Sequence, residues 1–195
     1  MLGTSGNLSG VLEREPLKLA ITPSGMPKGD LVAEQILDID ESCAVTHGTG
    51  KPSAEARLHV EVIRARGASA VLHTHSMWST LLSDRHAAMG GLAVEGYEML
   101  KGLEGVTTHE HREWIPILDN DQDMPRLAGR VQEALIQHPT CHAFLLRRHG
   151  MYTWGDSLAQ AVRHVEIVEF LLEAVARTDQ LASGDGRDRL GTEQR

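Results

Sequence analysis

The sequence predicts a single α/β domain with a central sheet. Short runs typical of strands are mixed along the whole chain with segments of helical period, and neither a strict strand–helix–strand repeat nor an internal repeat is present. The 195 residues, 41% of them apolar, are enough for one substantial core. We expect one domain over residues 1–181 and a disordered tail over 182–195, where Gly, Asp, Arg and Ser follow without period.

The predicted strands are short and end at turn-forming residues. Residues 3–10 are small and polar, and they predict a loop. The run at 17–22 alternates and ends at the turn signal Pro23-Ser24-Gly25. Residues 91–118 predict short strands with a helical turn at 98–101. The other strands are expected at 35–40, 43–46, 70–75, 143–146 and 151–154.

Helices are predicted from apolar spacing and from end signals. Residues 54–66 have helical spacing, with Ser53 as the cap and Gly67 as the end. The clearest helix is the last, because Ser157 and Gln160 form a capping-box pattern ahead of a long apolar face. Further helices are expected at 77–83 and 124–137.

Charge and composition exclude several classes of partner. A formal net charge of −8 argues against nucleic acid or an anionic membrane, and 4% aromatic residues argue against a base-stacking platform. No run is long and apolar enough to span a membrane, and the N-terminus lacks a signal-peptide pattern, so we expect a cytoplasmic protein. Cys43 and Cys141 form no Cys-x-x-Cys pair and predict small half-buried residues rather than a thiolate metal site.

Three histidines follow buried strands and could share a metal ion. His73 and His75 come after the apolar run at 70–72, and residues two apart on a strand point to the same face. His149 follows another apolar strand, and Gly150 allows a sharp turn that could aim its ring inward. Three imidazoles with an open position are typical of catalytic zinc. The alternative is that they are surface or hydrogen-bonded core histidines.

The other histidines predict ordinary roles. His109 and His111 have the same spacing, but polar residues surround them, so we expect a solvated loop with a smaller chance of touching the site. His59 and His164 fall on predicted helices, where packing or surface roles are expected.

Two glutamates could transfer protons beside a metal. Glu98 and Glu55 each lie near the start of a predicted helical segment. An exposed glutamate favoured by the helix dipole is an equally good interpretation of each. Loops rich in small residues at 4–7 and 23–25, together with Ser53, could hold a phosphate, and Lys28 could supply a cation.

Taken together, these segments resemble the class II aldolase/adducin family of zinc enzymes that act on sugar phosphates. The resemblance covers Thr4 to about Glu173, and its last three motifs resemble the dehydratase branch of the family. The matching segments are Thr4-Ser5-Gly6-Asn7-Leu8-Ser9, Lys51-Pro52-Ser53-Ala54-Glu55, His73-Thr74-His75-Ser76, Gly96-Tyr97-Glu98-Met99, Asn120-Asp121-Gln122-Asp123 and His149-Gly150-Met151-Tyr152-Thr153-Trp154-Gly155.

The resemblance implies a role for each candidate residue. Glu98 would be the acid/base residue of the dehydratase branch, and Glu55 matches the catalytic glutamate of the aldolases. The implied fold is a three-layer class II aldolase-like fold, in which helices flank a central, mainly antiparallel sheet. The implied assembly is a homotetramer with active sites near subunit interfaces. His73, His75 and His149 would bind one Zn²⁺ per subunit, and Asn7, Ser24, Gly25 and Ser53 would hold the substrate phosphate.

The implied activity is a hydro-lyase reaction of methionine salvage. It would convert 5-methylthioribulose 1-phosphate to 5-methylthio-2,3-dioxopentyl phosphate and water. The alternatives are a sugar-phosphate aldolase or epimerase, and an inactive scaffold of the same fold. Two departures bear on the resemblance. Ala54 stands where many aldolases have a second Ser, and only three residues precede Thr4, where family members usually carry a helix that would support the sheet edge and the phosphate loop.

Overall fold

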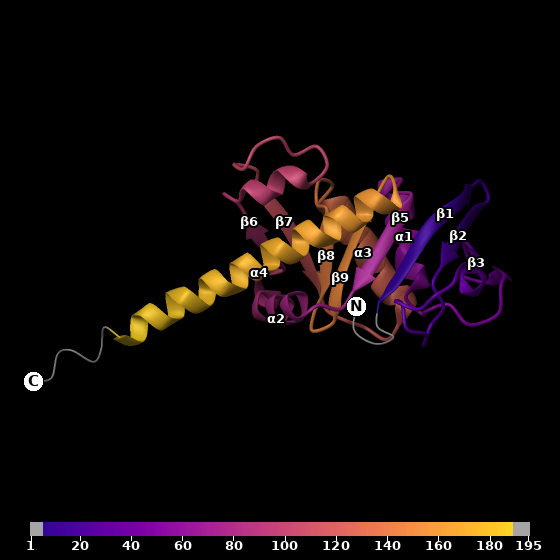
Figure 1. Cartoon of the computed structure of the whole chain (residues 1–195), viewed down its shortest axis with the longest axis horizontal. Coiled ribbons are helices and arrows are strands. Elements are labelled where there is room, and N and C mark those ends of the chain that lie inside the picture. Colours follow the sequence, from indigo (N-terminus) through magenta and orange to yellow (C-terminus); the bar gives the residue numbers. More distant parts are fainter. Residues whose placement is uncertain (1–5, 189–195) are drawn as a thin grey trace, which may run out of the picture.

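The computed structural model describes residues 6–188, which form one sheet with helices on both faces (Figure 1). The strand order is β4-β3-β2-β1-β5-β9-β8-β7-β6, and every neighbouring pair is antiparallel except β7 and β8. The mainly antiparallel sheet predicted above is therefore confirmed. The strands are β1 Asn7–Arg14, β2 Leu17–Ile21, β3 Leu37–Asp40, β4 Val45–His47, β5 Ala70–Thr74, β6 Gly91–Val94, β7 Glu113–Leu118, β8 Ala143–Leu146 and β9 Gly150–Gly155.

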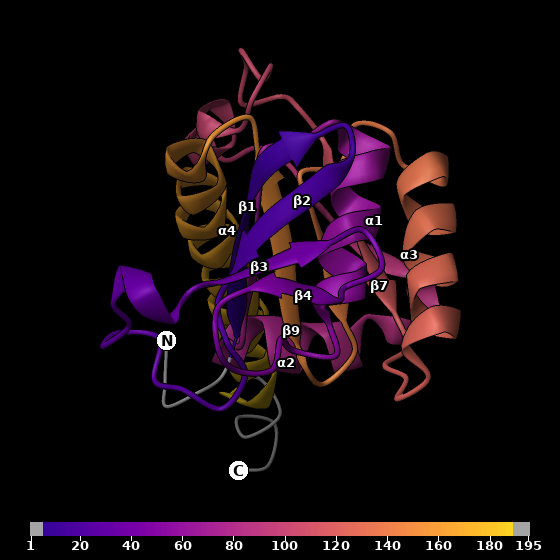
Figure 2. The ribbon, with the colours of Figure 1, turned by 90° about the vertical axis from the view of Figure 1, so that its right-hand side faces the viewer.

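The helices complete a three-layer arrangement. α1 (Ala56–Arg66) and α3 (Met124–Gln137) cover one face, and α4 (Leu158–Asp188) covers the other (Figure 2). α2 (Met77–Arg85) packs against α4. Each face has its own apolar core: Leu58, Val131 and Phe144 are buried on the first, and Leu145, Val168 and Leu172 on the second. Short 3-10 turns lie at Ala33–Gln35, Ala87–Met89 and Glu98–Gly102.

The helix ends differ from the prediction in small ways. Gly67 ends α1 as predicted, with φ +64° and its N–H bonded to Ile63 O. Ser53 is not the N-cap of α1, because Glu55 takes that position and its N–H donates to Ser53 Oγ. At the start of α4, Ser157 Oγ accepts from Gln160 N–H as predicted, while the Gln160 side chain accepts from the preceding Asp156 N–H instead of from Ser157.

The loop predicted for residues 3–10 is wrong over its second half, because β1 begins at Asn7. β1 pairs with β2 on one side and β5 on the other, so its backbone N–H and C=O groups are satisfied on both edges. Sheet pairing decides the conformation here, and the low strand propensity of Gly and Ser is overridden. Residues 1–5, including Thr4 and Ser5 of the predicted phosphate loop, lie outside the described residues.

α4 extends beyond the predicted end of the domain. Its backbone stays helical to Asp188, seven residues into the segment expected to be a tail. Residues 189–195 lie outside the described residues, so the prediction of a tail there stays a prediction. Among residues 6–188, no helix has both the length and the apolar composition that a membrane span needs.

A buried ion pair joins the start of β7 to the start of β8. The carboxylate of Glu113, 1% exposed, accepts from His142 N–H at 2.8 Å and His142 Nδ1 at 3.0 Å. His111 Nε2 lies 2.8 Å from the same carboxylate, so His111 belongs to this cluster. His142 Nε2 lies 2.8 Å from Glu104 O. Both nitrogens of His142 therefore face acceptors, which requires the charged imidazolium.

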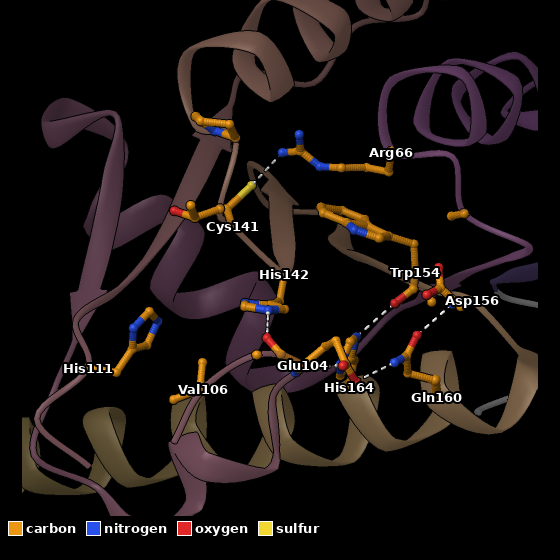
Figure 3. A pocket seen from close by; sticks show the side chains of 15 residues that line it. Arg66, Glu104, Val106, His111, Cys141, His142, Trp154, Asp156, Gln160 and His164 are labelled. Atoms are coloured by element: carbon orange, nitrogen blue, oxygen red, sulfur yellow. Dashed lines mark hydrogen bonds between the residues drawn. The ribbon is translucent and has the colours of Figure 1, made fainter. Parts of the chain in front are cut away.

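This cluster borders a pocket of about 400 Å³ next to Arg66 and Trp154 (Figure 3). Burial opposes the charges, but the hydrogen bonds outweigh it: they lower the pKa of Glu113 and raise the pKa of His142. Arg66 gives its terminal nitrogens to Leu135 O and His138 O. Most of these polar groups are hydrogen-bonded to one another or to backbone carbonyl groups, which is typical of a structural element.

We predict that Glu113→Gln lowers the free energy of unfolding by about 3–5 kcal/mol near pH 5.5, because it leaves a buried charged histidine without its partner. The contribution of Glu113 is present above its ordinary pKa of 4.5 and is lost as pH falls through the lowered value. The contribution of His142 is present below 6.5 and is lost as pH rises through the raised value. Urea unfolding across pH 3–8 measures the difference in free energy of unfolding between the wild type and the variant. This difference should be largest between pH 4.5 and pH 6.5.

The matched control is Glu95→Gln, since the Glu95 side chain is 68% exposed and its ion pair with Arg112 is long, at 3.7 Å. It should change stability little at any pH. Equal effects of the two variants, or a pH-independent effect of Glu113→Gln, would contradict the structural role of this ion pair.

Candidate metal centre

Strand β5 delivers two histidines to one end of the sheet. His73 is fully buried and lies opposite Asn7 of β1 and Tyr152 of β9. Its ring stacks on Tyr152 with centroids 4.2 Å apart. His75 follows immediately after the last strand residue, Thr74, and is exposed. The core therefore holds the ring of His73, whereas the ring of His75 faces solvent at the same end of the sheet.

The turn between β8 and β9 supplies the third ring. Arg148 has a positive φ of +55°, and its N–H donates to Ser83 Oγ at 3.0 Å. The left-handed residue of the turn is thus Arg148, whereas Gly150, which was expected to allow the turn, already belongs to β9. The physical reason is that Ser83 of α2 holds the strained backbone in place. His149 follows and points back towards β5.

Gly150 has a different role, which is close packing against β5. A Cβ placed there would meet Thr74 O at 2.3 Å, His73 Cε1 at 3.0 Å and His75 Cδ2 at 3.1 Å. Such a contact with backbone oxygen is far below van der Waals distance, so no side chain fits without separating the strands. The absence of a side chain lets the turn bring His149 against the other two rings.

The three rings converge as the sequence predicted. One nitrogen from each of His73, His75 and His149 lies within 4.8 Å of the others, and the Nε2 atoms of the first two are 2.9 Å apart. His73 Nδ1 donates to Met151 O at 3.0 Å, which leaves an unprotonated Nε2 facing the cluster. Burial lowers the pKa of His73 to about 4, so its neutral form is favoured. Neutral imidazoles held by a backbone carbonyl are the donor set that zinc and similar divalent metals prefer.

Glu55 is the carboxylate of this cluster. Its oxygens lie 3.2 Å from His149 Nε2 and 3.6 Å from His73 Nε2, and Asn7 Nδ2 donates to it at 2.7 Å. Burial opposes its charge, but attraction to the His73 and His149 rings in their protonated form and the hydrogen bond from Asn7 outweigh burial, so the pKa of Glu55 lies below its ordinary value. An ionised carboxylate within reach of a three-histidine centre can accept a proton from a bound molecule.

The four residues expected to hold phosphate line one small cavity with the cluster. Its volume is about 160 Å³. Ser24 N–H donates to Lys51 O, and Gly25 has φ +75°, a conformation that favours glycine. Lys28 also lines the cavity, and its Nζ donates to Pro23 O and Met26 O. Burial lowers the pKa of Lys28. The lining residues are Gly6, Asn7, Pro23, Ser24, Gly25, Lys28, Ser53, Glu55, His75 and His149.

Glu98 lies apart from this cavity within the chain. It is 70% exposed, pairs with Lys101, and has His109 Nδ1 at 3.8 Å. Met99 and Phe170, 39% and 49% exposed, border a shallow cavity with it. His109 is on the surface, and neither it nor His111 lines the metal cavity.

The sequence reasoning gave no role in the site to two buried residues. Tyr152 supports the His73 ring, and His59, fully buried on α1, contacts Asn7. His59 follows Glu55 by four residues, and residues four apart lie on the same face of a helix. That spacing could have indicated that His59 faces the site.

Comparison with known proteins agrees with this geometry. The model for the class II aldolase and adducin N-terminal domain matches residues 1–176. The chain belongs to the class II aldolase family. It is 45% identical over 175 residues to methylthioribulose-1-phosphate dehydratase of Methylococcus capsulatus, covering 89% of this chain and 83% of that protein. It is 42% identical to the enzyme of the same name from Pseudomonas fluorescens, covering 94% and 87%.

Solved structures of L-fuculose 1-phosphate aldolases have the same fold. An L-fuculose 1-phosphate aldolase aligns with a TM-score of 0.75 at 24% identity, over 93% of this chain and 79% of that one. The L-fuculose-1-phosphate aldolase from Thermus thermophilus aligns with a TM-score of 0.73 at 24% identity, over 94% and 88%. The predicted class II aldolase-like fold is confirmed.

We predict that Gly150→Ala weakens divalent-metal binding by about 10–100-fold, the range expected when the support of metal ligands is disturbed. The new Cβ would collide with Thr74 O and push His149 away from the other rings. Metal titration of the apoprotein by calorimetry gives the affinity. Gly129→Ala on α3 is the control, because nothing lies within 4 Å of its Cβ position. Wild-type affinity in Gly150→Ala would show that the rings do not depend on this close packing.

Proposed function

We propose that this protein is a metal-dependent hydro-lyase that dehydrates 5-methylthioribulose 1-phosphate to the 2,3-diketone phosphate, a step of methionine salvage. The observation that carries the proposal is the convergence of three imidazoles, one carboxylate and a small cavity in one place. Relatives 42–45% identical over most of the chain are named for this activity, which supports the same substrate here. The cytoplasmic location expected from the sequence stays a prediction.

His73, His75 and His149 are the proposed metal ligands, and Zn²⁺, one per subunit, is the proposed metal. Three neutral nitrogen donors without a thiolate suit zinc, and the remaining coordination position is then free for the substrate. When bound, such a metal supplies Lewis acidity to the oxygens of the ketose.

Glu55 is the proposed proton-transfer residue. Dehydration removes the hydrogen from the carbon next to the ketone and breaks the carbon–oxygen bond of the following hydroxyl, which leaves as water. The remaining enol then becomes the second ketone by moving one proton from oxygen to carbon. The lowered pKa keeps Glu55 ionised at neutral pH, as a general base must be.

The cavity beside Glu55 is the proposed phosphate site. Asn7, Ser24, Gly25 and Ser53 offer amide, hydroxyl and backbone N–H donors there. The Lys28 ammonium on the same wall adds positive charge. A phosphate held at this end fixes the carbon chain of the sugar relative to Glu55 and the three rings.

Glu98 takes part, in this proposal, from a second copy of the chain in a homotetramer. Within one chain it does not line the metal cavity, and its carboxylate pairs with Lys101. Exposed apolar residues lie beside it. Met99 and Phe170 beside it are the kind of surface that a subunit interface covers. Glu98 would then approach the site of its neighbour as a second acid/base residue.

The first test is direct. Purified protein incubated with 5-methylthioribulose 1-phosphate should form the diketone, followed by its absorbance or by NMR, and should contain about one zinc per chain. His73→Ala should lose both the metal and the activity. No diketone, with carbon–carbon cleavage of another ketose phosphate instead, would favour an aldolase. A stable metal-free oligomer without activity would favour an inactive scaffold.

The second test separates the two glutamates. We predict that Glu55→Gln and Glu98→Gln each lower kcat by about 10²–10⁴-fold while zinc content is unchanged. Mixing inactive Glu98→Gln with inactive His73→Ala should restore about a quarter of wild-type activity, since random exchange of subunits pairs an intact metal centre with an intact Glu98. Mixing Glu55→Gln with His73→Ala should restore none, because both residues belong to the same chain. Absence of recovery in the first mixture would place Glu98 outside the site.

A further inference from the structure

We infer that His59 is a positioning residue that acts through Asn7 on Glu55, and this inference rests on the proposed role of Glu55. His59 lies on α1, one turn after Glu55, and is fully buried. It touches neither the metal cavity nor the solvent. Its two ring nitrogens are nevertheless part of a continuous hydrogen-bonded chain that ends at the carboxylate.

The chain has four members, two from β1 and two from the start of α1. Ser9 Oγ lies 2.7 Å from His59 Nδ1, and His59 Nε2 is hydrogen-bonded to Asn7 Oδ1. Asn7 Nδ2 donates to Glu55 Oε2 at 2.7 Å. Asn7 and Ser9 are both 3% exposed and lie on the same face of β1, two residues apart. The whole path is buried until it reaches Glu55.

The direction of each hydrogen bond follows from chemistry. The carboxylate oxygen of Glu55 accepts from Asn7 Nδ2, so the Asn7 amide turns its NH₂ towards Glu55 and its Oδ1 towards His59. His59 must then donate from Nε2, which leaves Nδ1 to accept from the Ser9 hydroxyl. Burial lowers the pKa of His59 to about 3, which agrees with a neutral ring that has one donor and one acceptor.

The consequence is that His59, as the Nε2–H tautomer, stabilises the orientation of the Asn7 amide that Glu55 requires. The flipped amide would place Oδ1 against the carboxylate of Glu55, and it would place NH₂ against the ring N–H of this tautomer. In the selected orientation, Asn7 Nδ2 has two hydrogens. One goes to Glu55, and the second is free to point into the phosphate cavity that Asn7 lines. His59 thus links the position of the base to the binding of the phosphate.

A packing role is the competing explanation, and the chain offers a matched comparison. His164 on α4 is also buried, 2% exposed, and both its nitrogens are bonded: Nδ1 to Trp154 O at 2.7 Å and Nε2 to Glu104 N–H at 3.2 Å. It borders the pocket of Figure 3 and has no bond to Asn7 or Glu55. Replacing His164 therefore measures the cost of losing a doubly bonded buried histidine as such.

The experiment compares His59→Leu, His59→Gln and His164→Leu in the zinc-loaded protein. We expect His59→Leu to lower kcat by about 10–100-fold and to weaken binding of inorganic phosphate, with one zinc per chain retained. His59→Gln keeps an N–H donor for Asn7 and should recover most of both losses. His164→Leu should lower thermal stability and leave kcat and phosphate binding unchanged.

A double variant tests whether the effect passes through Asn7. If His59 acts only through that amide, Asn7→Ala with His59→Leu should be no worse in kcat than Asn7→Ala alone. Additive losses, wild-type kcat in His59→Leu, or zinc loss in both His59 variants would overturn the inference. Phosphate binding needs no turnover, so it still compares the two His59 variants if the wild-type protein forms no diketone. Failure to form diketone counts against the proposed function, whereas equal phosphate binding by wild type and His59→Leu counts against the role of His59.

Discussion

The site depends on the register of three neighbouring strands. β1, β5 and β9 pair so that Asn7, His73 and Tyr152 lie in one row across the sheet. Residues opposite each other share a face, so all three side chains point to the α1 side, where Glu55 and His59 begin that helix. A slip of one residue would turn the row to the α4 face and dissolve the cluster. The pairing of the strands therefore decides which side chains can meet at the site.

Much of this was predictable because the decisive signals are local. The apolar runs before His73 and His149, and the period of residues 124–137, predicted strands and a helix that the structure confirms. Gly67 ends α1 by a rule that needs only its own backbone. The resemblance to the class II aldolases added the three-layer arrangement, which no single segment contains. The pairing of His73 with His75 needed only the period of a strand.

The misses have one cause, which is contact between segments far apart in sequence. Residues 7–10 look like a loop until β2 and β5 pair with them on both edges. Arg148 adopts a left-handed conformation because Ser83 accepts its N–H, and no pattern around Arg148 predicts that. The place of Gly150 against Thr74 O is likewise a property of two strands. The residues of the cluster can be read from the chain, whereas the distances between them depend on the sheet.

The two ends of the sheet hold similar residues with opposite consequences. Around Glu113, His142 donates from both nitrogens and His111 adds another bond, so few polar atoms are left for a ligand. Around Glu55, the nitrogens of three histidines face each other and only the distant nitrogen of His73 is bonded to the backbone. Nitrogen lone pairs that converge on one point suit a cation. The first arrangement holds two strands together, and the second matches the metal site proposed above. The difference lies in how many hydrogen bonds the surroundings supply, since the residue types are the same.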